Sequence, residues 1–91
     1  MTRAQVARAF IAGKRGTSHN SATDGTTYRL HGHAICTRTA EGYAFDWCGW
    51  HTRTTAAHIN EILRLIDPTL RVSYAAARDG HERSQFVIAA R

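Results

Sequence analysis

Six histidine and cysteine side chains gather around one predicted hairpin and the turn that follows it: His31, His33, Cys36, Cys48, His51 and His58. They place two imidazoles and a thiol near one end of the hairpin and a Cys-x-x-His spacing at the other. Zinc binds four such nitrogen or sulfur ligands in a tetrahedron, and a site drawn from both strands is sterically allowed. The spacing matches no standard zinc finger, however, and Cys36 falls in the middle of a strand rather than in a knuckle.

We therefore predict that the chain holds no metal and no cofactor. In this interpretation the two cysteines are small buried residues, and the histidines belong to turns or to the surface. The alternative is a zinc-stabilised structural module, which would lose thermal stability on chelation. Its weak candidate ligands are His31, His33, Cys36, Cys48 and His51.

The sequence offers little for catalysis. A cysteine nucleophile needs a base, an orienting group and an oxyanion pocket, and no local signature surrounds either cysteine. The carboxylates are scattered among turns and exposed positions, with no pair spaced for acid–base work: Asp24, Glu41, Asp46, Glu61, Asp67, Asp79 and Glu82. We predict that the chain is not an enzyme.

The charge is strongly basic. Twelve lysine and arginine residues face seven acidic ones, for a formal net charge of +5, and Lys14 is the only lysine. Arginine pairs in bidentate fashion with phosphate or carboxylate, so the expected partner is nucleic acid or an acidic protein surface. Plain solubility is the alternative explanation. The Gly-Lys-Arg-Gly-Thr-Ser-His-Asn stretch lacks the spacing of a nucleotide-binding loop, although Lys14, Arg15 and His19 could contact phosphates.

The two tryptophans have different expected roles. Trp47 lies on the apolar face of the hairpin and should belong to the core. Trp50 follows a glycine, and we expect it to close the end of the sheet over the start of the next helix. In the alternative it is exposed beside His51 and Arg53, where it would form a typical binding hot spot.

Length and hydropathy define the class of molecule. Ninety-one residues are one domain with one small core. No run approaches the roughly 20 apolar residues of a membrane span, so we expect a soluble, cytoplasmic protein. Two cysteines are too few for a secreted disulfide scaffold.

The N-terminal third should contain one helix, one loop and one strand. Thr2 can cap a helix over residues 3–12, and Gly13 can end it. Residues 13–26 show no apolar period and should form a flexible loop. Residues 26–30 form a short strand, and His-Gly-His at 31–33 turns the chain into the central hairpin.

The hairpin joins residues 34–39 to residues 43–48 through a three-residue loop that places Thr39 opposite Tyr43. This register places Ile35, Tyr43, Phe45 and Trp47 on the core face. The other face then carries Ala34, Cys36, Arg38, Ala44, Asp46 and Cys48. A slip of one residue would bring Ile35 opposite Asp46, which argues for the odd loop length.

The C-terminal half predicts a helix and a second hairpin. Threonines at 52–55 can cap the helix, Thr54 being the preferred cap, and an apolar stripe recurs at helical spacing before Asp67-Pro68: Ile59, Ile62, Leu63 and Ile66. Apolar residues then alternate at 70–76 and 86–90, with Val72 expected opposite Ile88 and Tyr74 opposite Phe86. The predicted fold is α+β, an antiparallel sheet of about five strands with two helices in the order α-β-β-β-α-β-β.

Two stretches resemble small proteins carried by bacteriophages and other mobile elements. One is Thr-Asp-Gly-Thr-Thr-Tyr-Arg-Leu-His-Gly-His-Ala-Ile at residues 23–35; the other is Gly-Trp-His-Thr-Arg-Thr-Thr at 49–55, with His-Ile-Asn at 58–60. The likeness runs from about residue 13 to residue 66. These motifs describe a turn, a hairpin and a helix cap; they carry no catalytic residue, and the two cysteines are not part of the pattern.

The resemblance implies an accessory role. Small phage proteins of this size often inhibit host defence, anti-CRISPR proteins among them, or regulate nucleic acid. We expect a non-enzymatic inhibitor that binds a host defence protein or ribonucleoprotein complex in the bacterial cytoplasm, with a DNA- or RNA-binding regulator as the alternative and a zinc-stabilised module as the third hypothesis. The candidate binding residues are Arg8, Lys14, Arg15, Arg29, Arg38, Trp50 and Arg53. The oligomeric state stays open, since sheet edges at residues 26–30 or 83–90 could pair with another strand.

Overall fold

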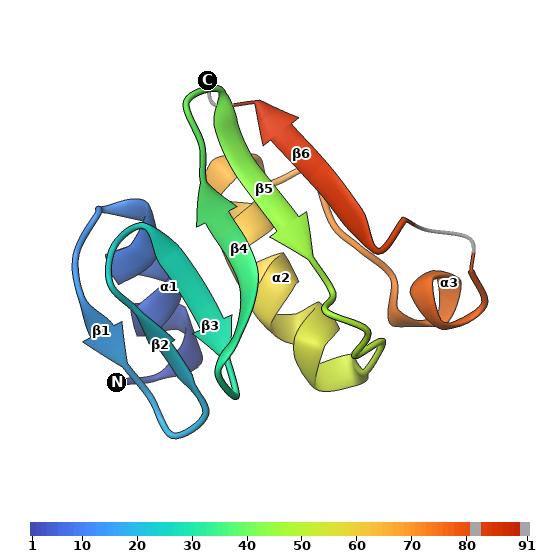
Figure 1. Cartoon of the computed structure of the whole chain (residues 1–91), viewed down its shortest axis with the longest axis horizontal. Helices are drawn as coiled ribbons and strands as arrows, with labels where there is room; N and C mark the ends of the chain where they lie inside the picture. Colours follow the sequence, from blue (N-terminus) through green and yellow to red (C-terminus); the bar gives the residue numbers. More distant parts are fainter. Residues whose placement is uncertain (81–82, 90–91) are drawn as a thin grey trace.

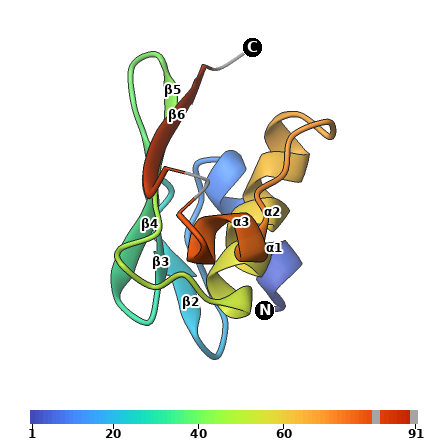
Figure 2. The same ribbon diagram turned by 90° about the vertical axis from the view of Figure 1, so that its right-hand side faces the viewer.

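The computed structural model describes residues 1–80 and 83–89 and shows an α+β fold, as predicted (Figure 1). The described elements are α1 (Arg3–Ile11), β1 (Gly16–Thr17), β2 (Ser21–Thr23), β3 (Thr27–Leu30), β4 (His33–Arg38), β5 (Gly42–Asp46), α2 (Arg53–Ile66), α3 (Tyr74–Arg78) and β6 (Gln85–Ala89). The strands form one antiparallel sheet in sequence order, β1-β2-β3-β4-β5-β6. The helices lie on one face of the sheet, and the opposite face is bare (Figure 2). Within the described residues, no helix is long and apolar enough to span a membrane.

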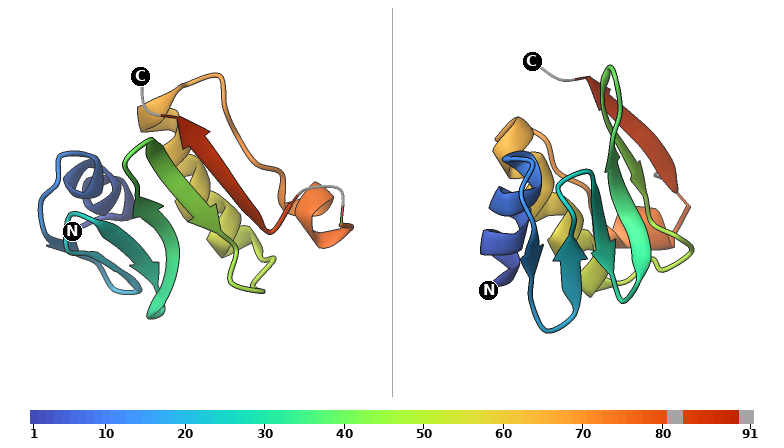
Figure 3. Two further views of the ribbon diagram at one scale, coloured as in Figure 1. Left: turned by 45° about the horizontal axis from the view of Figure 1, so that its top comes forward. Right: turned by 60° about the vertical axis from the view of Figure 1, so that its left-hand side comes forward.

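Helix α1 begins and ends where its sequence signals predict. The Thr2 hydroxyl accepts a hydrogen bond from the Gln5 N–H, and the Gln5 side chain returns one to the Thr2 N–H, which completes a capping box. Gly13 follows the helix at φ +72°, a left-handed conformation that favours glycine. Val6, Ala7 and Phe10 are buried, and α1 lies beside α2 behind the first strands of the sheet (Figure 3).

Residues 13–26, predicted to be a loop, contain the strands β1 and β2. The prediction missed them because hydroxyl groups rather than apolar side chains stabilise this segment. Thr23 is buried; its hydroxyl donates to the Thr27 carbonyl (2.8 Å) and accepts from the Gly25 N–H (3.0 Å). Gly25 sits so close to the end of α1 that an added Cβ would lie 2.5 Å from the Gly13 oxygen. The segment therefore folds back tightly against α1.

The turn between β3 and β4 is a tight two-residue turn. His31 and Gly32 both have positive φ, at 50° and 82°, and Leu30 pairs with His33. This is the pattern of a two-residue type I′ hairpin, which suits the twist of the strands. Strand β4 then bulges, because Tyr28 pairs with Cys36 while Arg29 already pairs with Ala34. The extra residue is Ile35, and both Ile35 and Cys36 are buried as a result.

The predicted register of the central hairpin was wrong by one residue. Thr39 and Gly42 exchange backbone hydrogen bonds across a two-residue turn, and Arg38 pairs with Tyr43, Cys36 with Phe45. Cys36 therefore joins the core face instead of the outer face. The bulge explains the outcome: it lets the tighter turn form while Ile35 still faces the core.

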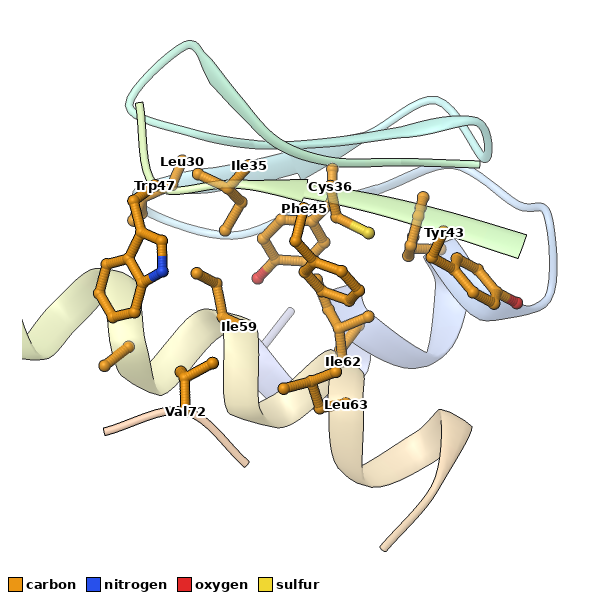
Figure 4. Packing of buried hydrophobic residues seen from close by; sticks show 14 of the residues in the cluster. Leu30, Ile35, Cys36, Tyr43, Phe45, Trp47, Ile59, Ile62, Leu63 and Val72 are labelled. Atoms are coloured by element: carbon orange, nitrogen blue, oxygen red, sulfur yellow. The ribbon is translucent and has the colours of Figure 1, made fainter. Parts of the chain in front are cut away.

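Helix α2 carries the main apolar face. Its cap is Thr52 rather than Thr54, with the Thr52 hydroxyl accepting from the Thr55 N–H at 3.2 Å. The stripe is confirmed: Ile59, Ile62 and Leu63 are buried, and Ile66 packs against the same cluster. Figure 4 shows Ile59, Ile62 and Leu63 facing Ile35, Phe45 and Trp47 on the sheet side of the core. The helix ends at Ile66, before Asp67-Pro68, as predicted.

The second predicted hairpin does not form. Residues 70–72 are irregular, and Tyr74–Arg78 is helix α3, capped by the Ser73 hydroxyl. The Asn60 side chain accepts from the Val72 N–H (2.7 Å) and donates to its carbonyl (3.1 Å), so it occupies the backbone groups that a strand would use. Strand β6 instead pairs with β5, with Phe86 opposite Phe45. The predicted end of this strand at Ala90 lies outside the described residues.

Candidate binding site at the start of helix α2

A pocket of about 310 Å³ lies where the β3–β4 turn, the end of β5 and the start of α2 meet. Its lining residues are Leu30, His31, His33, Ile35, Trp47, Trp50, Thr52, Thr54 and Thr55. The floor is apolar and buried, with Trp47 fully inaccessible between the sheet and α2 (Figure 4). The rim is exposed and carries His31, His33 and Trp50. The pocket therefore offers an apolar interior with polar groups around its mouth.

Trp50 is 55% exposed, so the expectation that it closes the sheet end was wrong. Its ring lies 5.7 Å from that of His33, centroid to centroid, at a tilt of 41°. Trp47 is buried, as predicted, and its ring stacks on the ring of His51 with 5.4 Å between their centroids. His51 Nε2 in turn lies 3.0 Å from the Ser84 hydroxyl. The two aromatic rings thus have separate roles, one in the core and one at the surface.

Two turns with unusual backbone geometry form the walls of this pocket. Among the described residues, His31 and Cys48 are the non-glycine positions with positive φ, at 50° and 55°. The left-handed conformation costs such residues roughly 1–2 kcal/mol. At Cys48 local bonds hold it: the backbone N–H donates to Asp46 Oδ1 (2.7 Å), and the thiol lies 3.2 Å from the Ala34 carbonyl oxygen. The Trp50 N–H then donates to the Trp47 carbonyl at 2.9 Å, which sets Trp50 at the rim.

The start of α2 supplies the polar wall. Thr52 caps the helix, and the Thr52 and Thr55 hydroxyl oxygens lie 3.0 Å apart. The N–H groups of the first helical turn at Arg53 and Thr54 have no carbonyl partner within the helix. No acidic residue stands in this first turn to balance the positive end of the helix dipole. This wall therefore favours a hydrogen-bond acceptor.

The indole nitrogen of Trp47 is the one buried side-chain nitrogen or oxygen without a hydrogen-bond partner in the described part of the chain. A buried donor left unpaired costs about 1–3 kcal/mol. Trp47 is retained in the core despite this cost, where its large ring fills the space between β5 and α2.

The predicted basic residues do not form one patch. Lys14 and Arg15 are exposed in the α1–β1 connection, and Arg29 is exposed on the bare face of the sheet. Arg15 and Arg29 line a shared hollow that also contains Asp24. Arg8 is exposed on α1, in the helical layer. Arg53, at the start of α2, lies 5.4 Å from the centre of the Tyr74 ring.

Arg38, a predicted binding residue, makes internal contacts with the end of α1. Its guanidinium donates to the Phe10 carbonyl (2.7 Å), the Ile11 carbonyl (3.2 Å) and the Tyr43 hydroxyl (3.2 Å). It also lies over the rings of Phe10 and Tyr43, at 5.5 and 5.2 Å from their centres. These carbonyls belong to the last turn of α1, where a cation is favourable. Arg38 thus fastens α1 to the central hairpin.

Replacing Arg38 by methionine should lower the free energy of unfolding by roughly 2–3 kcal/mol, because the variant keeps the packed stem and loses the charged hydrogen bonds. Arg38→Lys should recover only part of the loss, since an ammonium lacks the planar fork that reaches two carbonyls and a hydroxyl. Urea unfolding followed by circular dichroism measures both. Equal stabilities of wild type and Arg38→Met would show that this anchor contributes nothing.

The structure does not assemble the zinc ligands that the alternative hypothesis requires. Within the described residues, no three histidine, cysteine or acidic side chains lie close enough to share a metal ion. Cys36 is buried in the core, where burial raises the pKa of its thiol to about 12. Burial also raises the pKa of Cys48, whose sulfur faces a backbone carbonyl. His33 and His51 each face a tryptophan ring.

Several residues of the pocket were candidates from the sequence, but no pocket was predicted to contain them together. Trp50, His31 and His33 were candidates for separate reasons, as an anchor and as metal ligands. Leu30, Ile35 and the threonines were assigned only structural roles. The sequence shows Gly49-Trp50 just before a threonine-rich helix start. That these residues meet the β3–β4 turn depends on the type I′ turn and on the bulge in β4.

Fold and site together define a small α+β domain with one bare sheet face and an aromatic pocket at the start of its longest described helix. Comparisons with protein-family models, curated proteins and solved structures found no match.

Proposed function

We propose that this chain is a non-enzymatic binding protein of the phage accessory type, which inhibits a host defence complex by occupying part of its surface. The observation that carries the proposal is Trp50, a large aromatic ring that is 55% exposed at the mouth of an apolar pocket. Tryptophan is enriched among the residues that dominate protein–protein binding, and such residues lie beside pockets that lose water on binding.

The partner should present one large side chain to this pocket. A volume of about 310 Å³ suits a single aromatic or long aliphatic group, with Trp50 and His33 covering it from outside. The backbone N–H groups at the start of α2 would donate hydrogen bonds to a carbonyl or carboxylate oxygen next to that group. The net charge of +5 would speed association with an acidic surface. A site of this kind fits stoichiometric binding in the host cytoplasm.

A DNA- or RNA-binding regulator is the second candidate, favoured by the exposed pair Arg15 and Arg29 around one hollow. Asp24 in the same hollow opposes phosphate binding. The backbone N–H groups of Thr27 and Thr26 lower the pKa of Asp24, so this carboxyl is charged at neutral pH. Counterion release would give such a regulator a steep loss of affinity with added salt.

Replacing Trp50 by serine should abolish partner binding while changing stability little, because more than half of the side chain is already in solvent. The tagged protein is used to capture its partner from a bacterial host lysate, with and without nuclease, and the bound proteins are identified by mass spectrometry. Wild type should retain one protein complex in stoichiometric amount after nuclease treatment.

The matched control is Leu65→Ser, which removes a second exposed apolar side chain, 41% accessible, on the outer surface of α2. It should capture the partner as wild type does. Capture that vanishes with nuclease, or that survives in Trp50→Ser, would contradict the proposal.

A further inference from the structure

Strand β6 has a free edge. Among the described residues it pairs only with β5, so no described strand lies on the other side of its backbone. The Trp47 N–H donates to the Ser84 carbonyl at 2.9 Å, which fixes the phase of the ladder. Hydrogen bonding alternates along an antiparallel pair, so the backbone groups of Gln85, Val87 and Ala89 point away from β5. Three N–H and C=O pairs are thus open to another strand.

This edge lacks the usual protection against pairing. Native edge strands are commonly blunted by lysine, by proline or by a bulge. The residues of β6 are Gln-Phe-Val-Ile-Ala, without a charge or a proline, and their register with β5 is continuous. Val87, at the centre, is 64% exposed. The sequence of β6 is therefore suited to pairing with another strand.

An apolar groove of about 290 Å³ runs along the inner side of the same strand. It lies between β6 and the connection that follows α2, since residues of both segments line it. Its lining residues are Leu63, Leu70, Arg71, Val72, Arg83, Phe86 and Ile88. A strand added to β6 would direct every second side chain toward this groove.

The charges around the groove favour one kind of occupant. Both charged residues in the described part of its lining, Arg71 and Arg83, are positive and exposed. The nearest acidic side chain in β5, Asp46, lies on the other face of the sheet and accepts from the Gln85 amide at 3.0 Å. We propose that β6 binds an extended segment of a partner protein, apolar toward the groove and acidic at its rim, by strand addition.

A second copy of the chain fits this edge less well. Pairing two β6 strands would bring the Arg71 and Arg83 side chains of both copies to one interface, and each copy carries a net charge of +5. Like charges at an interface disfavour association. An acidic segment instead gains from the same two arginines.

This inference goes beyond the proposed function, because it names a second surface and a different mode of recognition. The Trp50 pocket accepts a side chain, whereas β6 pairs with a backbone. Binding of a short peptide at β6 should therefore survive in the Trp50→Ser variant even though capture of the host complex is lost, and failure at one surface leaves the other proposal standing.

The test uses two short fluorescein-labelled peptides with the same centre of alternating valine and threonine, one flanked by glutamates and one flanked by lysines, titrated against the full chain by fluorescence anisotropy. The glutamate peptide should bind saturably, and it should slow hydrogen exchange at the amides of Gln85, Val87 and Ala89. Val87→Pro should weaken binding about tenfold or more, because proline removes the central outward N–H while remaining tolerated on an edge strand. Val87→Ala keeps that N–H and is the matched control.

A second variant guards against misfolding in Val87→Pro. The double change Arg71→Glu and Arg83→Glu leaves the backbone intact and should also weaken the glutamate peptide about tenfold or more. Its control, Arg8→Glu with Arg29→Glu, makes the same change in net charge away from the groove and should bind nearly as wild type. No saturable binding, equal binding of the lysine peptide, or binding unaffected by Val87→Pro would overturn the proposal. So would a dimer of the chain alone, seen by sedimentation, that Val87→Pro dissolves.

Discussion

Replacing Ile62 with aspartate will unfold the domain. Ile62 is fully inaccessible and lies on the face of α2 that meets the sheet (Figure 4). Losing a buried isoleucine side chain costs about 2–5 kcal/mol, and a carboxylate buried without a partner costs several kcal/mol more. Small domains have a total stability of about 5–15 kcal/mol, so the two costs together reach that range. Circular dichroism and amide NMR spectra should show an unfolded chain at room temperature.

Two controls separate the burial effect from a general effect of the mutation. Ile62→Val should remain folded and lose only about 0.5–1.5 kcal/mol. Leu65→Asp places the same charge on the same helix at a position that is 41% exposed, and it should fold. A well-dispersed NMR spectrum of Ile62→Asp would contradict the assignment of this face to the core.

Acidification from pH 7 to pH 4 will destabilise the domain by roughly 3 kcal/mol through His58 alone. Its side chain is 2% exposed, and burial lowers its pKa from 6.5 to about 4. The Tyr28 hydroxyl lies 2.6 Å from His58 Nδ1, a hydrogen bond whose donor depends on the tautomer of the ring. Below pH 6.5 His58 is protonated in the unfolded chain, whereas in the folded chain it becomes protonated only near pH 4. Stability is therefore full above pH 6.5 and falls by up to about 1.36 kcal/mol for each pH unit between pH 6.5 and about pH 4.

Urea unfolding at a series of pH values measures this slope. His58→Gln removes the titrating group while retaining a side chain that can accept from Tyr28, and its stability should be nearly flat between pH 6.5 and pH 4.5. The Asp24 carboxyl, whose pKa backbone N–H groups lower from 3.8, loses its contribution only in stronger acid. A wild-type profile as flat as that of His58→Gln would show that His58 is not held neutral in the fold.

The elements with strong local signals could be predicted from sequence. Helix α1 has its capping box, helix α2 has an apolar stripe at 3.6-residue spacing, and recognisable turns separate β3, β4 and β5. Two segments could not be predicted because side-chain hydrogen bonds, rather than apolar patterns, decide them. The Asn60 side chain holds the backbone at Val72, and hydroxyl hydrogen bonds around Thr23 form strands without an apolar pattern.

The candidate site was predictable only in fragments. Local sequence singled out Trp50 but favoured burial for it, because tryptophan is usually buried and the turn at Cys48-Gly49 could not be placed. Arg38 was predicted to be a surface cation, whereas it hydrogen-bonds to the end of α1, more than twenty residues away in the chain. The open edge of β6 was not predicted, because the expected second hairpin paired this strand with residues 70–76. In the structure β6 pairs with β5 instead.

The central proposal is that a partner protein docks at Trp50, and site-specific crosslinking tests this most directly. A photo-reactive aromatic amino acid, which keeps a large ring at the rim of the pocket, replaces Trp50 in one variant and Arg29, on the bare face of the sheet, in another. Each is irradiated in nuclease-treated host lysate, with unlabelled wild type as competitor. We predict one competed protein adduct from position 50 and none from position 29. An adduct from position 29 alone, or adducts that form only with nucleic acid, would contradict the proposal.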